Sequence, residues 1–131
     1  MTKGLKVAMI VYGALHILMG LMFIFVREQM GTIMGYEKGP EYIHYFMTML
    51  GVSFIVPGAF IIVAATRDIL KNILWVQLAI AWSFLVVVVA AYSMMRGFIT
   101  FSQEGTALII NAVFAIALLA LYPWRVKPSG K

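Results

Sequence analysis

Cysteine is absent from this chain of 131 residues. Its absence excludes a disulfide framework, a thiolate metal site, an iron–sulfur cluster and thiol redox catalysis by this chain alone. Charged residues are also scarce: they make up 11% of the chain, whereas about a quarter of an ordinary soluble domain is charged. Apolar residues fill their place, at 63% of the chain. A soluble domain this small has too much surface for its volume to bury so many apolar side chains, so the composition predicts that lipid surrounds the chain.

Lysine, arginine, aspartate and glutamate are all missing from four long apolar stretches of the sequence. About 20 helical residues cross the hydrocarbon core of a bilayer, and a backbone without water around it must satisfy its own hydrogen bonds, which makes each stretch a helix. The predicted transmembrane helices cover residues 7–26, 43–65, 73–95 and 106–122. The connections are short, so sequential helices should be antiparallel neighbours. The sequence therefore predicts a single all-α domain, an integral membrane four-helix bundle with up-down antiparallel topology.

Basic residues stand at the ends of these apolar stretches. The formal net charge of +5 therefore indicates membrane anchoring and orientation, with no nucleic-acid partner. With the N-terminus inside, seven basic residues fall on the cytoplasmic side and three fall outside. The inner set is Lys3, Lys6, Arg67, Lys71, Arg125, Lys127 and Lys131, and the outer set is Arg27, Lys38 and Arg96. Because cytoplasmic segments carry the excess of positive charge in membrane proteins, both termini are predicted to lie in the cytoplasm.

Small residues recur at helical spacing within the predicted helices. Gly13 and Gly20 share one face of the first helix, because residues seven apart lie two turns apart on the same side. Gly51 and Gly58 repeat this spacing in the second helix, and Asn111 lies on a small-residue face of the last helix. Small residues mark the places where membrane helices approach closely. We therefore predict that these five residues pack helix against helix.

His16 is the only ionisable side chain in the central part of a predicted span. An intramembrane ionisable residue calls for a functional hypothesis. Burial favours the neutral imidazole, which could bind a quinone, ligate a metal or haem, or relay a proton. The structural alternative is a hydrogen bond to Ser53, Ser83 or a carbonyl freed by Pro57. Both interpretations remain open at this stage, and His16, Ser53 and Ser83 are the candidate ligand-binding residues.

His44, the second histidine, lies at the outer start of its helix, whereas His16 lies near the bilayer midplane. At 1.5 Å per residue their depths differ by on the order of 15 Å, too far to share one metal ion or haem. Glu37, Glu41 and Glu104 lie at the level of His44, where a solvated interface is favoured over a metal site. The sequence contains no nucleophile–base pair, phosphate-binding loop or paired intramembrane carboxylates. We therefore predict no catalytic residue, no metal site and no cofactor for this chain alone, with haem or quinone bound only if a partner shares it.

The segment GALHILMGLMFIF at residues 13–25, a glycine-bearing second helix that ends in Ala-Thr-Arg, and a tryptophan-rich third helix resemble the DoxX-like group of small bacterial four-helix membrane proteins. The similarity extends over nearly the whole chain and is carried by glycines and hydropathy. The resemblance implies an integral protein of the bacterial cytoplasmic membrane, associated with a redox or biosynthetic complex. It carries no catalytic residue over to this sequence.

Two functions follow as predictions. The first is an accessory, non-catalytic membrane subunit that packs against other integral membrane subunits or against itself, in a redox, electron-transfer or oxygenase complex. Its basis is the lack of site chemistry together with more small-residue faces than one small bundle needs. The alternative is a binder or transporter of a quinone or another lipophilic ligand, with its pocket at His16.

Overall fold

The computed structural model describes residues 2–35 and 42–124. Within these ranges the chain forms helices only: α1 (Thr2–Phe25), α2 (Arg27–Met34), α3 (Tyr42–Thr66), α4 (Ile73–Met95) and α5 (Phe101–Leu121). Every helix except α2 is long and apolar enough to cross a membrane. The predicted all-α class and four-helix membrane bundle are confirmed.

The last transmembrane helix begins earlier than its hydropathy predicts. α5 starts at Phe101, five residues before the predicted start at residue 106. The backbone N–H of Thr100 donates to the side-chain oxygen of Gln103 at 2.8 Å, which caps the first turn. Such a bond satisfies a backbone donor that has no partner inside the helix, so polar residues can form a first turn that hydropathy alone would assign to a loop. As a consequence Glu104 belongs to this helix.

The short helix α2 follows α1 after a bend at Val26. It ends at Gly35, whose φ of 79° lies in the left-handed region that glycine adopts without strain. Met30 in α2 is buried against Phe23 of α1 and Met47 of α3, and we call these three residues the three-helix cluster. α2 thus closes over the end of the α1–α3 pair.

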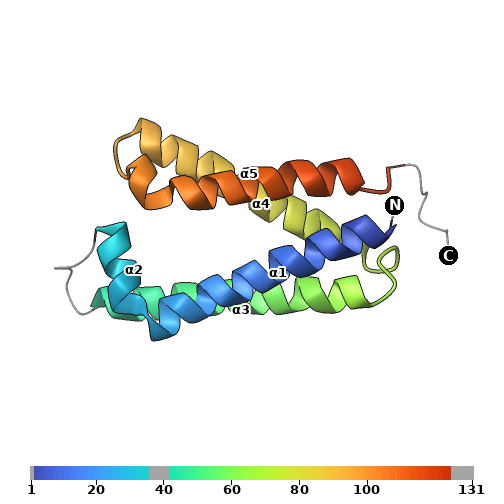
Figure 1. The fold of residues 1–131 in the computed structure, drawn as a ribbon, viewed down its shortest axis with the longest axis horizontal. Helices are drawn as coiled ribbons and strands as arrows, with labels where there is room; N and C mark the ends of the chain where they lie inside the picture. The colour runs from blue at the N-terminus through green and yellow to red at the C-terminus, as the bar shows by residue number, and fades with distance from the viewer. Residues whose placement is uncertain (1, 36–41, 125–131) are drawn as a thin grey trace.

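The four long helices are arranged as two antiparallel pairs. α1 packs along α3, and α4 packs along α5, whereas contacts between the pairs are fewer (Figure 1). A Cβ atom built on Gly4, near the start of α1, would lie 3.4 Å from the Leu121 side chain at the end of α5. The chain therefore starts its first span and finishes its last span at the same end of the bundle, which we call the closed end.

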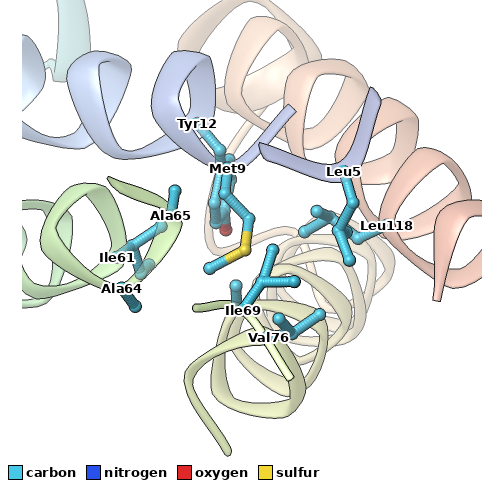
Figure 2. Packing of buried hydrophobic residues seen from close by; sticks show 10 residues of the cluster. Leu5, Met9, Tyr12, Ile61, Ala64, Ala65, Ile69, Val76 and Leu118 are labelled. Carbon is cyan, nitrogen blue, oxygen red and sulfur yellow. The ribbon is translucent and has the colours of Figure 1, made fainter. Parts of the chain in front are cut away.

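In the described part of the chain, buried side chains from all four long helices form one apolar cluster, which lies toward the closed end. The shared core, drawn in Figure 2, combines residues from the first half of α1, the last turns of α3, the α3–α4 connection, the start of α4 and the last part of α5. Its members are Leu5, Met9, Tyr12, Ile61, Ala64, Ala65, Ile69, Val76, Ala79 and Leu118. Toward the opposite end, the three-helix cluster draws on α1, α2 and α3 but not on α4 or α5. The two pairs are thus joined by buried side chains at one end, and the site described next lies where this shared core stops.

Candidate functional site

Two reciprocal glycine contacts hold α1 against α3. A Cβ atom built on Gly13 would lie 2.6 Å from the carbonyl oxygen of Gly58, and one built on Gly58 would lie 2.7 Å from the carbonyl oxygen of Gly13. Gly20 and Gly51 form the same kind of contact seven residues further along α1. A Cβ atom built on Gly20 would lie 2.5 Å from the Gly51 carbonyl oxygen, and one built on Gly51 would lie 2.6 Å from the Gly20 carbonyl oxygen. The two backbones therefore touch at two levels, which only residues without a side chain allow.

His16 lies on α1 between these two contacts and is 5% exposed. Its Nδ1 atom is 3.0 Å from the carbonyl oxygen of Tyr12, one turn earlier in the same helix. A carbonyl oxygen can only accept a hydrogen bond, so Nδ1 carries the proton and Nε2 is left as an acceptor. Nε2 is buried and has no hydrogen-bond partner in the described part of the chain. The imidazole therefore presents one unsatisfied acceptor to its surroundings.

Trp82, on α4, has the complementary property. Its Nε1–H group, which can only donate, is also buried and also lacks a partner among residues 2–35 and 42–124. The Trp82 ring packs edge-on against the His16 ring, with centroids 6.5 Å apart. One unpaired acceptor and one unpaired donor thus belong to two rings in contact, contributed by the two helix pairs.

Further aromatic rings enclose this pair. Tyr12 approaches the imidazole edge-on at 4.2 Å between centroids. Phe54 of α3 lies 5.4 Å from His16 and 6.4 Å from Trp82. Such surroundings exclude bulk water and favour flat, apolar groups, while two unpaired polar atoms remain inside them. The four rings, which we call the aromatic cluster, therefore form a largely apolar site with two specific hydrogen-bonding atoms.

A groove of about 410 Å³ begins at Trp82 and follows α4 away from the closed end. Apolar side chains of α4 and Ile99 line most of it, and Glu104 in the first turn of α5 supplies a carboxylate at its far end. Glu104 is half-buried. The volume falls in the range of about 300–1,000 Å³ that is typical of small-molecule sites. The aromatic cluster and the groove share Trp82, so the groove adjoins the cluster.

Of the three residues predicted to bind a ligand, the structure places His16 in the aromatic cluster, Ser83 beside it and Ser53 away from it. Ser53 is exposed on the bundle surface, where its hydroxyl donates to the Met49 carbonyl at 2.9 Å. Ser83 is fully buried, but its hydroxyl donates to the Ile80 carbonyl at 3.0 Å and interacts with the side chain of Tyr12. The hydrogen bond of His16 goes to the carbonyl oxygen of Tyr12, not to either serine or to a carbonyl freed by Pro57. The helix continues through Pro57 within α3.

Two amide side chains of the spans, those of Asn111 and Gln77, bond across to a neighbouring part of the bundle. Asn111 of α5 accepts a hydrogen bond of 2.9 Å from the Tyr12 hydroxyl of α1. Gln77 of α4 donates at 2.7 Å to the Tyr122 hydroxyl just after α5. The hydrogen bond of Asn111 connects the two helix pairs at Tyr12, which belongs to both the shared core and the aromatic cluster.

The sequence does not single out Trp82 as a site residue, and it places Glu104 only at the solvated outer interface. Tryptophan in membrane helices is enriched at the interfaces, so a tryptophan in the middle of a span indicates a specific packing or hydrogen-bonding role. For Glu104 the signal is the Thr100–Gln103 spacing of a capped helix start. Both signals are present in the sequence, but neither reveals which helix face the residue occupies.

Metal binding finds no support in the described part of the chain, where no group of three or more His, Cys, Asp or Glu side chains could hold an ion. Glu37, Glu41 and the His44 side chain, which form the predicted outer cluster with Glu104, lie outside the described residues, as do Arg125, Lys127 and Lys131.

The sequence matches no protein-family model, and neither a curated protein nor a solved structure matches the chain. The resemblance to the DoxX-like group therefore stays a prediction, and any proposal for function depends on the site itself.

Proposed function

We propose that this membrane protein binds a lipophilic small molecule whose polar group lies at His16 and Trp82 and whose apolar part lies in the groove along α4. One observation carries the proposal: an acceptor and a donor, both buried and both unpaired, lie on two contacting rings at the end of an apolar groove. Native structures contain few such atoms, and each one calls for a partner.

The energetic reason is the cost of burying polar atoms without hydrogen bonds. Each unpaired buried group costs roughly 1–3 kcal/mol, so a protein that keeps two of them on contacting rings gains stability from any molecule that bonds both. A single water molecule could do so. The groove favours a larger ligand, because it extends the same space along an apolar surface that water would not fill.

The test is to purify the chain in lipid nanodiscs and identify the bound apolar molecules by mass spectrometry. We expect one compound in near-stoichiometric amounts, which His16→Leu removes while the helical signal and the thermal unfolding transition persist. Gln77→Leu is the matched control, since it also replaces a polar residue of a span, at a position exposed and away from the groove. Equal amounts of bound compound in the native chain and in His16→Leu would contradict the proposal and favour a purely structural histidine.

The accessory-subunit function stays a prediction, and the structure uses internally the small residues on which it depends. Gly13, Gly20, Gly51 and Gly58 pack against one another, and Asn111 bonds to Tyr12 within the chain. The spare small-residue faces that suggested outside partners are therefore occupied. The same purification tests this prediction too, because a stoichiometric partner protein would migrate with the chain.

We further propose that the closed end faces the cytoplasm. The basic residues near it include Lys3, Lys6, Arg67 and Lys71, whereas Arg27 and Arg96 lie at the other end. The chain has no cysteine, so single introduced cysteines report position without background. We expect a membrane-impermeant maleimide to label Arg96→Cys in intact cells and to label Lys71→Cys only after lysis. The reverse pattern would invert the orientation.

A further inference from the structure

We propose that His16 and Trp82 select a hydroxyl group, so that the ligand is a long-chain phenol, a quinol or an alcohol rather than a quinone, an ether or an ammonium compound. This inference rests on the proposed function and specifies the chemistry of the same site. It follows from which atom at the site carries a proton.

The tautomer of His16 is fixed from within its own helix. The Tyr12 carbonyl oxygen lies 3.0 Å from Nδ1 and has no proton to give, so Nδ1 must donate. In the neutral ring that burial favours, the other nitrogen is then an acceptor. Nε2 therefore needs a partner that brings a proton.

Trp82 imposes the opposite requirement. An indole N–H donates and never accepts, so its partner must offer a lone pair. Both atoms are buried on rings that contact each other. A ligand that pairs both atoms must therefore offer one donor and one acceptor to two neighbouring rings.

A hydroxyl group offers both on one oxygen atom. A quinone, a ketone or an ether can accept from Trp82 but leaves Nε2 unpaired, and an ammonium group can donate to His16 but leaves the indole N–H unpaired. Sites built to hydrogen-bond a hydroxyl discriminate strongly against analogues without one, because the buried polar groups are then left unsatisfied.

The surroundings indicate the rest of the molecule. Phe54 and Tyr12 pack against the imidazole, which suits a flat ring bearing the hydroxyl. The groove follows α4 from Trp82 to Ser93, a rise of roughly 16 Å at 1.5 Å per residue, which suits an alkyl chain.

The experiment compares para-octylphenol with its methyl ether, para-octylanisole, which keeps the ring, the oxygen and the octyl chain but carries a methyl group in place of the donor hydrogen. The chain has three tryptophans, and a double variant with Trp75→Phe and Trp124→Phe keeps only Trp82. The tryptophan fluorescence of this variant in nanodiscs therefore reports binding at the site itself. Trp75 stacks on Phe60 and Trp124 is exposed, both outside the groove lining. We expect the dissociation constant of the phenol to be lower than that of the ether by a factor of at least about five, since the ether leaves Nε2 unpaired. His16→Leu should abolish that preference.

The outcomes separate the two proposals. Equal binding of phenol and ether overturns the hydroxyl selection but leaves lipophilic binding standing, whereas no binding of either molecule contradicts both. If His16→Leu fails to fold, the ¹⁵N chemical shift of the His16 imidazole in the native chain provides a second readout. We expect the phenol to shift the Nε2 resonance and the ether not to. A shift with neither molecule, although both bind, would overturn the hydroxyl selection.

Discussion

Replacing Gly20 by alanine should lower the free energy of unfolding by about 2–3 kcal/mol. The added Cβ atom would lie 2.5 Å from the Gly51 carbonyl oxygen and 3.1 Å from the backbone nitrogen of Ile55. Both are backbone atoms, so neither can move aside as a flexible side chain would. Helix α1 must separate from α3, and the van der Waals contacts along both helices weaken together.

The measurement is the unfolding free energy in mixed detergent micelles, followed by circular dichroism. Gly31→Ala is the matched control, because it also adds one methyl group to a helix but meets nothing within 4 Å. Alanine is the better helix former, so this control should be neutral or slightly stabilising. Equal destabilisation by the two variants would mean that the glycine contacts do not hold α1 and α3 together.

Replacing Tyr12 by alanine should cost about 3 kcal/mol, near the lower end of the range for aromatic residues in a core. Tyr12 is fully buried within the shared core, as Figure 2 shows. Its ring also packs on Phe114 of α5, with centroids 4.8 Å apart, and its hydroxyl bonds Asn111 of the same helix. Its loss therefore removes contacts between the two helix pairs at the end where they are joined.

Two variants locate the source of this effect. Tyr12→Phe removes only the hydrogen bond to Asn111 and should cost about 0.6 kcal/mol, the average for such bonds between membrane helices. Tyr92→Ala removes an exposed tyrosine of α4 and should leave the unfolding free energy nearly unchanged. A loss in Tyr12→Phe as large as in Tyr12→Ala would assign the stability to the hydrogen bond instead of to packing.

The sequence alone was enough to predict the helices, because length and apolar composition decide whether a segment spans a bilayer. It also indicated the faces of Gly13, Gly20, Gly51 and Gly58, since helical spacing follows from backbone geometry. The start of α5 at Phe101 could not be derived from hydropathy, because the Gln103 cap stabilises a polar first turn.

The site itself was only partly predictable. His16 stands out in the sequence as the one ionisable residue central to a span. Its hydrogen-bond partner is the Tyr12 carbonyl one turn earlier, and this partner depends on the side-chain rotamer of His16, which the sequence does not reveal. Its contact with Trp82 joins residues of different helix pairs. That contact depends on how far each helix is rotated about its axis, and the rotation is set by packing across the whole bundle.

The two glycine contacts have a mechanical consequence. They fasten α1 to α3 at two levels, so these two helices could change their separation or tilt only by pulling apart backbone atoms that touch. A rearrangement that makes room for a ligand beside Trp82 would therefore have to come from the packing of α4 and α5 against this pair.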